Sequence, residues 1–354
     1  DLDGAREYSL RALKKYPDHL DSLYIMIQIC GESGQWTELL NYGRRFLALR
    51  EILELHPERA GVILNCSLRE GGTVHMLMGH AHHTLGNAAD RDRHYGAAVE
   101  QSGDKWRFLL QIGIFHTDRS GDLPLGRRYL DLARQEAPTE PALWFMLSKW
   151  CNLAGNLDEE RSSLKRLWQL GTEDTELLNR LAALSLAADD PETAERALAD
   201  LLKAEPDNYQ GLVNQAVLKR RQNDLAGAVA ACERAIAIDP GRPGPWMNLG
   251  EISLTLGDLD NAAAFFTRII TLEGPPIKAL LYLCEVDLRR SDIEGFIHWC
   301  NRLLAALDLP RERTIHTLDD LVAIVQEIHT AFPPSEEFAA QTARILSLLP
   351  VQRH

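Results

Sequence analysis

Histidine is the residue type in this sequence whose spacing most directly allows chemistry. Five of the 12 histidines lie close together in the chain: His75, His80, His82, His83 and His94. A helix would place His80 and His83 on one side, where such a pair can chelate a metal ion, and His116 is expected nearby. The string has no His-Glu-x-x-His motif and no carboxylate at ligand spacing. Polar packing is therefore the favoured interpretation, a metal or pH-sensing site is the alternative, and no metal or cofactor is predicted.

Motifs of the common catalytic centres are missing or have a simpler explanation. Asp-x-Asp strings occur at positions 1–3 and 258–260, and in a nucleotide-sugar transferase such a pair holds a divalent cation. Here both lie at the start of a helical pattern, where the helix dipole favours acidic side chains. The sequence contains no Gly-rich phosphate loop and no Gly-x-Ser-x-Gly string. We therefore expect no catalytic activity from this chain.

The composition disfavours nucleic acid and membranes as partners. The formal net charge of -13 is spread along the 354 residues, so bulk attraction to phosphates and anionic lipids is disfavoured, which leaves a local basic patch as the alternative. No apolar run reaches the roughly 18 residues of a membrane-spanning helix, and the first residues lack the basic start of a secretory signal. The six cysteines include no Cys-x-x-Cys pair, which favours a reduced, cytoplasmic location. The chain does not begin with Met, so we expect it to be part of a longer protein.

A repeat with a step of 34 residues organises most of the chain. The unit at 243–276 shows two helical patterns separated by Gly257. Residues on one face of the first pattern are Trp246, Leu249, Gly250 and Ser253, and those on one face of the second are Ala262, Phe266 and Ile269. The same phase recurs in the units before and after it. The chain is therefore predicted to be a series of helix pairs.

Two positions of the repeat carry residue types with a clear structural role. The position of Gly257 is held elsewhere by Gly34, Gly86, Gly121, Gly155, Asp189, Asn223 and Ser291. This series predicts a left-handed residue that ends the first helix of each pair. Small residues recur where the two helices should cross: Gly79, Ser148, Ala182, Ala216, Gly250 and Cys284 on the first helix, and Ala194, Ala228 and Ala262 on the second. Gly126, Glu160 and Arg91 depart from this pattern, so their units are expected to be looser or locally shifted.

This pattern resembles the tetratricopeptide repeat family, whose unit has the same length. The match is strongest in the Trp-x-x-Leu-Gly string at 246–250, with Ala262, Phe266 and Pro276 downstream. The resemblance covers about residues 20–310. It implies an all-α, right-handed superhelical solenoid of helix pairs with a C-terminal helical cap.

The repeat phase also predicts the boundaries of the parts. Residues 1–19 are expected to be the second helix of a truncated repeat, 20–53 one repeat, 54–71 an irregular insertion, 72–310 seven repeats and 311–354 the capping helices.

In this family the first helices of the pairs line a concave groove. The resemblance places the following residues on that groove: Tyr24, Met76, His80, His83, Phe108, Gln111, Phe115, Arg119, Phe145, Lys149, Asn152, Asn179, Arg220, Arg221, Met247 and Glu251. Aromatic, Met and Arg side chains are typical anchors of protein interfaces. Its middle section is mildly basic because of Arg119, Lys149, Arg220 and Arg221, so a peptide with some acidic character is the expected ligand.

The predicted function is that of a non-catalytic scaffold that binds a protein or peptide segment in this groove. The alternative is an accessory arm of a larger enzyme, because some bacterial family 2 glycosyltransferases carry similar repeats. The catalytic domain would then lie outside this sequence. A third hypothesis is a sensor of metal or pH built on the histidines.

Overall fold

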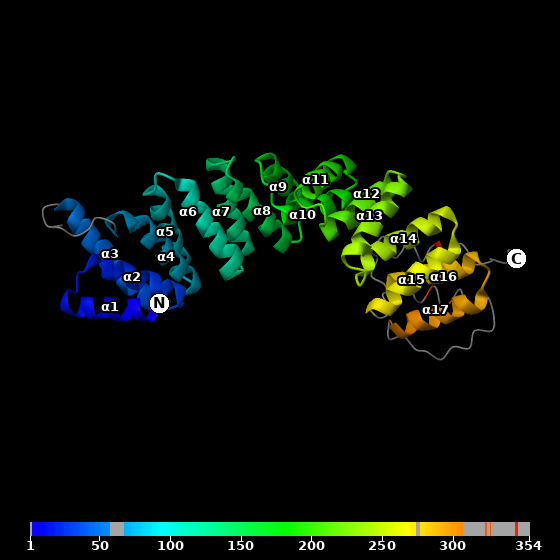
Figure 1. Cartoon of the computed structure of the whole chain (residues 1–354). Helices are drawn as coiled ribbons and strands as arrows, with labels where there is room; N and C mark the ends of the chain where they lie inside the picture. The colour runs from blue at the N-terminus through cyan, green and yellow to red at the C-terminus, as the bar shows by residue number, and fades with distance from the viewer. Residues whose placement is uncertain are drawn as a thin grey trace. The chain divides into compact units, whose positions relative to one another are not determined.

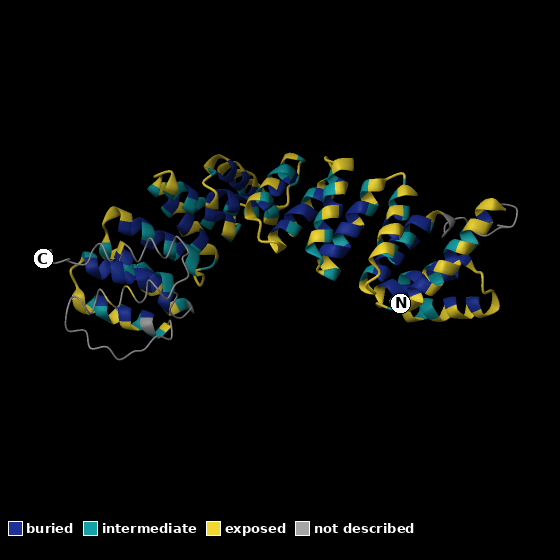
Figure 2. Ribbon diagram, turned by 180° about the vertical axis from the view of Figure 1, so that it is seen from behind, coloured by how far each residue is buried: buried dark blue, intermediate teal, exposed yellow. Residues whose placement is uncertain are grey.

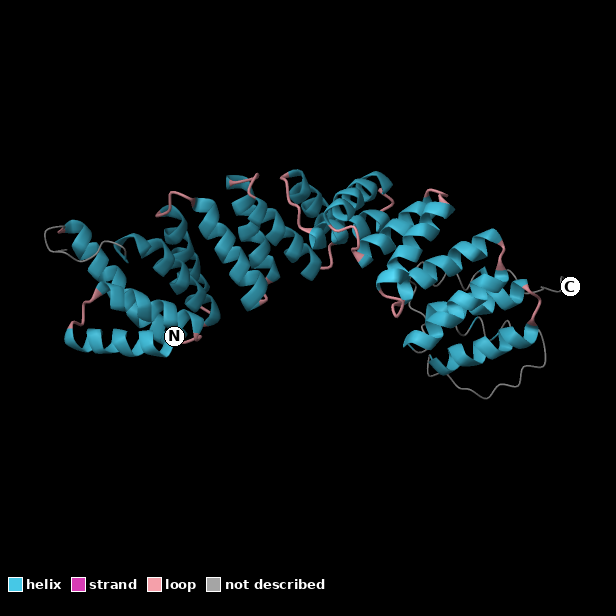
Figure 3. Cartoon of the chain, viewed as in Figure 1, coloured by secondary structure: helices cyan, strands magenta, loops and turns pink. Residues whose placement is uncertain are grey.

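The computed structural model describes residues 2–56, 67–273 and 277–306, together with the single residues 323, 326, 344 and 345. Every regular element within these residues is a helix, and no strand occurs among them (Figure 3). The expected all-α class is confirmed. The expected cap at 311–354 and the middle of the expected insertion, 57–66, lie outside the described residues apart from the single positions 323, 326, 344 and 345.

The chain divides into two compact units, and the first is Asp1–Thr172. Its helices succeed one another along the chain as labelled in Figure 1. They are α1 (Leu2–Lys15), α2 (Leu20–Glu32), α3 (Trp36–Leu55), the 3-10 turn η2 (Ser67–Glu70), α4 (Gly71–Thr84), α5 (Ala88–Glu100), α6 (Lys105–Phe115), the π-helical turn η3 (His116–Ser120), α7 (Leu123–Glu136), α8 (Pro141–Leu153) and α9 (Leu157–Gln169).

The second unit is Glu173–His354. Its described helices are α10 (Thr175–Ala187), α11 (Pro191–Ala204), α12 (Tyr209–Arg221), α13 (Leu225–Ile238), α14 (Pro243–Leu256), α15 (Leu259–Glu273), α16 (Ile277–Arg289) and α17 (Ile293–Ala306). In Figure 2 most helices carry buried residues on one side and exposed residues on the other, as the amphipathic pattern of the sequence requires.

Each unit is a row of helix pairs. Within a pair the first helix packs on the second, as α2 on α3, α4 on α5, α12 on α13 and α14 on α15. Successive pairs also touch through their first helices, since α4 contacts α2 and α6, and α12 contacts α10 and α14. This is the arrangement of an all-α helical repeat, in which a pair buries its apolar side only against its neighbours. The assignment of 1–19 to a truncated repeat stays a prediction.

The crossing of the two helices in a pair is closed by small residues, as the sequence predicts. A Cβ atom on Gly79 would lie 2.3 Å from the ring of Tyr95, and one on Gly250 would lie 2.4 Å from the ring of Phe266. Ala194, Ala228 and Ala262, on second helices, have no exposed surface. The glycines thus admit a large aromatic ring from the second helix into the crossing.

The two charged residues expected at crossings have polar partners. Arg91 Nε donates to Asp92 Oδ1 over 2.8 Å. Glu160 is 3% exposed, and its two carboxylate oxygens each lie 3.4 Å from Asn152 Nδ2. A buried charge is tolerated when such partners replace water.

All eight predicted turn residues have the left-handed backbone. The φ angles of Asp189, Asn223 and Ser291 are 55°, 61° and 61°, and the five glycines of the series have φ between 70° and 79°. A residue with a Cβ atom in this conformation costs about 1–2 kcal/mol. The three side-chain-bearing turns therefore carry strain that the glycine turns do not.

One pair departs from the regular repeat at the end of its first helix. Gly86 and Gly121 are separated by one residue more than the period, and the chain absorbs that residue in the π-helical turn His116–Ser120. A Cβ on Gly126 of α7 would lie 2.7 Å from Thr117 Oγ1, so the widened turn explains why glycine replaces the usual alanine there. The unit of Gly126 thus has the local shift that the sequence predicted.

The crossing generates a prediction about Ala194→Glu. Glu160 has Asn152 eight residues upstream as its donor, whereas the residue eight positions before Ala194 is Leu186, which is buried and apolar. A new carboxylate at position 194 would therefore lack the donor that serves Glu160. We expect a loss of at least about 2 kcal/mol of unfolding free energy, measured by urea titration. Ala199→Glu, on the exposed side of the same helix, is the control and should change the stability little. Equal stability of the two variants would contradict this packing.

The turn strain generates a second prediction. Ser291→Gly should raise the unfolding free energy by about 1 kcal/mol, because glycine adopts the left-handed conformation without the Cβ clash. Ser291→Val should lower it, because a β-branched residue fits there worst. Thermal melts of both variants and the parent chain measure the order. A valine variant as stable as the glycine variant would show that Ser291 does not hold this backbone.

Candidate functional site

The structure places three of the predicted groove residues in the core of the first unit. Met76, His80 and Phe115 are only 7%, 6% and 7% exposed. The His80 ring stacks on the Phe115 ring with 3.8 Å between centroids, and Met76 belongs to the hydrophobic cluster around Tyr95. These side chains hold α4 against α6 and α5 and do not form an accessible surface.

Helix α8 presents an exposed strip of predicted residues. Phe145, Lys149 and Asn152 follow one another at helical spacing, all three are exposed, and Phe145 is 44% accessible. Lys149 Nζ pairs with Asp118 Oδ2 at 2.7 Å, which connects the strip to the turn after α6. An exposed aromatic ring between polar side chains is the typical composition of a protein-binding anchor.

The predicted residues of α6 and of its turn belong to the first helix of the preceding pair. Gln111 and Arg119 are exposed and Phe108 is half-buried. Tyr24, on α2, is half-buried and donates a hydrogen bond to Glu70 Oε2 over 3.1 Å. Burial, and then the charge of Glu70, raise the pKa of Tyr24 to about 12. Tyr24 is therefore a neutral hydrogen-bond donor that is already engaged.

In the second unit, Glu251 of α14 collects donors from the first helices on both sides. Arg220 of α12 lies 2.6 Å from it and Lys278 of α16 lies 3.3 Å from it. The Tyr282 hydroxyl donates to Glu251 Oε1 over 2.9 Å. These contacts connect three successive first helices. Glu251 thereby neutralises part of the positive charge of Arg220 and Lys278.

The remaining predicted residues of the second unit also bridge neighbouring helices. Asn214 Nδ2 donates to Asn179 Oδ1 over 2.8 Å. Arg221 Nη1 donates to the carbonyl oxygen of Leu186, and Arg289, two repeats on, lies 3.4 Å from the corresponding carbonyl of Leu254. Met247 is half-buried and packs against the core cluster of this unit. The basic residues expected to attract an acidic ligand are thus largely occupied within the chain.

The histidines form a buried network between α4, α5 and η3. The Tyr95 hydroxyl lies 2.7 Å from His80 Nδ1 and 3.0 Å from His116 Nε2. His116 Nδ1 lies 3.0 Å from Ser120 Oγ, and His116 has no exposed surface. His83, half-buried, approaches the His116 ring edge-on with 4.4 Å between centroids.

Burial sets the protonation of this network. Desolvation, followed by the charge of His116, lowers the pKa of His80 to about 3. Desolvation, followed by His83, lowers the pKa of His116 to about 4, and burial also lowers the pKa of His83. These imidazoles are therefore neutral at pH 7, and each carries a lone pair on one ring nitrogen.

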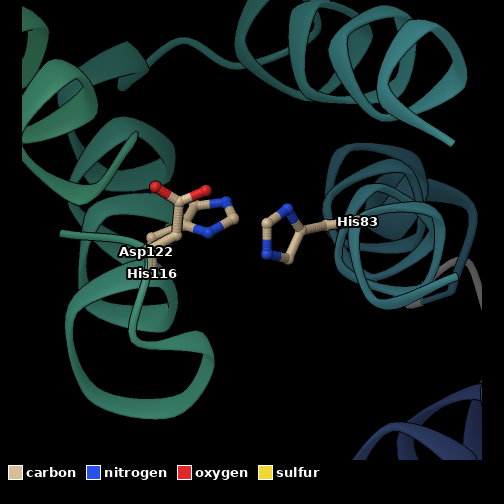
Figure 4. Close-up of side chains that lie close together, drawn as sticks. All are labelled: His83, His116 and Asp122. Carbon is tan, nitrogen blue, oxygen red and sulfur yellow. The ribbon is translucent and has the colours of Figure 1, made fainter. Parts of the chain in front are cut away.

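The carboxylate of Asp122 lies beside His83 and His116, whereas the sequence predicted no carboxylate at ligand spacing. His83, His116 and Asp122 each offer one ligand atom, and these atoms lie within 4.8 Å of one another. In Figure 4 the three side chains gather around a common space, with His83 coming from a different helix than the other two. Sequence spacing missed Asp122 because it follows the turn after α6. The extra residue between Gly86 and Gly121 was the available signal, since π-helical turns are frequent at functional sites.

A second histidine group lies on the other side of α4. His75 Nδ1 and His94 Nδ1 are 2.8 Å apart, and the rings of His82 and His94 stack at 5.3 Å. The cavity beside them has a volume of about 610 Å³ and is lined in part by Arg44, Arg50, Arg93, Glu51, Glu54 and Asp90. Burial, and then His75, lower the pKa of His94 to about 4. This group is closely packed, and His94 is neutral at pH 7.

The cysteine thiols in the described part of the chain are not accessible to solvent. Cys30, Cys151, Cys232, Cys284 and Cys300 are free and buried, while Cys66 lies outside the described residues. Burial is the main cause that raises the pKa of Cys232 to about 12. Thiols in such positions act as small core residues. Among the described helices, none has the length and apolar character needed to cross a membrane.

Comparison with known proteins finds family models that match part of the chain. Two family models described as tetratricopeptide repeat match residues 180–243 and 219–281, within the second unit. Protein CTR9 homolog from Arabidopsis thaliana is 28% identical over 127 residues, which are 36% of this chain and 12% of that protein. Superkiller complex protein 3 from Mus musculus is 24% identical over 205 residues, which are 55% of this chain and 13% of that protein. The chain thus matches about an eighth of each of these two relatives.

Among solved structures, the chain matches a tetratricopeptide repeat protein from Parabacteroides merdae that is 11% identical. The match covers 78% of this chain and 98% of that one with a TM-score of 0.47.

The histidine groups generate a prediction about acid stability. The pKa of His94 is lowered to about 4 by burial and the neighbouring His75, His82 and Arg93, against the opposing charge of Asp90. In the unfolded chain its pKa returns to the ordinary value near 6.5. The unfolded state then binds the proton first, so this contribution to stability is full above about pH 6.5 and is lost as the pH falls toward 4.

Hydrogen exchange read by mass spectrometry measures this loss segment by segment, after correction for intrinsic exchange rates. Peptides from α4 and α5 should lose protection between pH 6.5 and 4, whereas those from α12 and α13, which contain no histidine, serve as the internal control. Equal loss in both regions would contradict a specific role of the buried imidazoles.

Proposed function

Because this chain belongs to the tetratricopeptide repeat family, we propose that it is a non-catalytic scaffold that binds a protein or peptide segment. Repeats of this family serve in general as protein-interaction surfaces. The binding surface is the side formed by the first helices, and in the first unit we define the anchor strip as Phe145, Lys149 and Asn152 of α8. The proposed location is cytoplasmic, in keeping with five free, buried cysteines.

The observation that carries this proposal is the exposure of Phe145. Phe145 is 44% accessible to solvent, so a large part of its apolar ring stays in water. Docking of a partner on the ring would remove that surface from water. Lys149 and Asn152 beside it are exposed polar side chains; Lys149 Nζ already pairs with Asp118 and Asn152 Nδ2 lies near Glu160, so the Phe145 ring is the main anchor. The strip thus combines an apolar anchor with polar groups on a rigid helix, which lowers the ordering cost of association.

The acidic character of the ligand is a finer part of the proposal. Arg220 and Lys149 are paired with Glu251 and Asp118, so they attract an acidic ligand less than their number implies. Arg119 is exposed at the turn after α6 and is the basic residue near the anchor strip that we assign to such a ligand. An acidic residue of the ligand would then face Arg119 while an apolar residue covers Phe145.

An accessory arm of a larger enzyme, such as a family 2 glycosyltransferase, would use the same surface. In that case the anchor strip holds a substrate or a domain of the enzyme, and the catalytic residues lie outside this sequence. The test below addresses the surface that both proposals share.

The test compares two surface variants with matched controls. A library of peptides displayed on phage is selected against the full chain, and the affinity of the enriched peptides is measured by fluorescence anisotropy. Phe145→Ala and Arg119→Glu should each weaken binding at least about tenfold, as loss of an interface anchor does. Leu132→Ala and Lys203→Glu change the same residue classes on the exposed sides of second helices and should leave the affinity unchanged.

The outcomes separate the parts of the proposal. Enrichment of acidic peptides that depend on Phe145 and Arg119 supports it in full. Peptides that depend on Phe145 alone would remove the acidic preference. Peptides that bind all four variants equally would show that the anchor strip is not the binding surface.

A further inference from the structure

Among the titratable groups of the described residues, one cluster has the composition and spacing of a metal site. We propose that His83, His116 and Asp122 bind a divalent transition-metal ion, with Zn²⁺ as the natural probe. Their ligand atoms lie within 4.8 Å of one another. Around a tetrahedral Zn²⁺ with bonds of about 2.1 Å, ligand atoms are about 3.4 Å apart, so modest side-chain rotations close the site.

The ligands come from two neighbouring helix pairs. His83 lies in the last turn of α4, His116 begins the π-helical turn η3, and Asp122 caps the start of α7, where its Oδ1 accepts a hydrogen bond from the Leu125 amide over 3.0 Å. One carboxylate oxygen holds this cap and the other remains for the metal. A bound ion would therefore connect α4 to the following helix pair.

The hydrogen bonds of His116 select the nitrogen that binds. Ser120 Oγ contacts His116 Nδ1 and also accepts from the Asp122 amide over 3.2 Å, so Ser120 connects this ring to the backbone at Asp122. We assign Nδ1 as the nitrogen that binds the metal. Ser120 Oγ also lies 3.3 Å from the carbonyl oxygen of His116. When a metal takes the place of Ser120 at Nδ1, the hydroxyl keeps this carbonyl and the Asp122 amide as hydrogen-bond partners. Nε2 retains the Tyr95 hydroxyl, which is the outer hydrogen bond that metal-binding imidazoles usually have.

Protonation and charge favour the ion at neutral pH. Burial lowers the pKa of both His83 and His116, so neither imidazole has to release a proton before it binds. Arg91 is the nearby cation that would oppose the metal, and it is paired with Asp92 at 2.8 Å. Two nitrogens with one oxygen favour Zn²⁺ and its neighbours over Mg²⁺ or Ca²⁺, which prefer oxygen ligands.

Three protein ligands leave one tetrahedral position for water or for a side chain of a partner. We assign the ion the role of fastening two repeats together at the widened turn. Because the ion binds the folded arrangement, it should raise the melting temperature. This role is independent of the anchor strip and of any ligand bound there.

The experiment uses the full chain after treatment with a chelator and its removal. Isothermal titration with Zn²⁺ should show one site per chain, and a Zn²⁺ concentration 100 times the dissociation constant should raise the melting temperature by about 5–10 °C. Mg²⁺ at the same concentration should cause no comparable shift. Titration with Co²⁺ should produce visible absorption bands of a low-coordinate ion.

Variants locate the site. His83→Ala and Asp122→Asn should each weaken Zn²⁺ binding at least about tenfold and reduce the Co²⁺ bands. Asn caps a helix as well as Asp does, so Asp122→Asn should keep the fold, which circular dichroism checks. His298→Ala removes an exposed histidine from the second unit and is the matched control that should bind like the parent chain.

Two results would overturn the inference. The first is the absence of Zn²⁺ binding tighter than that of a variant lacking both His83 and Asp122. The second is tight binding that His83→Ala and Asp122→Asn leave unchanged, which would move the ion to another group such as His75, His82 and His94.

Discussion

The close crossing of two helices within each pair is the constraint on which the rest of this structure depends. It requires a glycine or alanine at the contact, as where Gly79 meets Tyr95 and Gly250 meets Phe266. It also requires a left-handed residue to reverse the chain within a short turn, and Asn223 or Ser291 accepts that conformation where glycine is missing. Once a pair is closed, its remaining apolar side can leave water only against the next pair. The row of helices is therefore a consequence of local geometry repeated along the chain.

Charge follows the same row. Glu251 gathers Arg220, Lys278 and Tyr282 from neighbouring first helices, and Arg221 and Arg289 reach back to carbonyl oxygens of the preceding first helix. These partly buried contacts connect neighbouring repeats, and they leave less unpaired positive charge than the residue types indicate. Recognition by this surface consequently depends more on exposed side chains such as Phe145 and Arg119 than on the total number of basic residues.

The widened turn after α6 affects both the packing of the helices and the position of the histidines. One residue beyond the repeat length creates the π-helical turn, which requires Gly126 opposite Thr117 and brings His116 beside Tyr95. Burial keeps these imidazoles neutral, so they serve as hydrogen-bonding core residues and retain lone pairs. A local irregularity thus supplies polar chemistry inside an otherwise apolar contact.

The sequence by itself determined the helix pairs, their left-handed turns and their small crossing residues, because these depend on residues close together in the chain. It also placed Phe145, Lys149 and Asn152 on one side of a helix. Only the tertiary structure decided that Met76, His80 and Phe115 are buried and that Lys149 and Arg220 are paired. It alone joined Asp122 to His83 and His116, because one inserted residue rotates the end of a helix, and periodicity does not show which side chains then meet across neighbouring pairs.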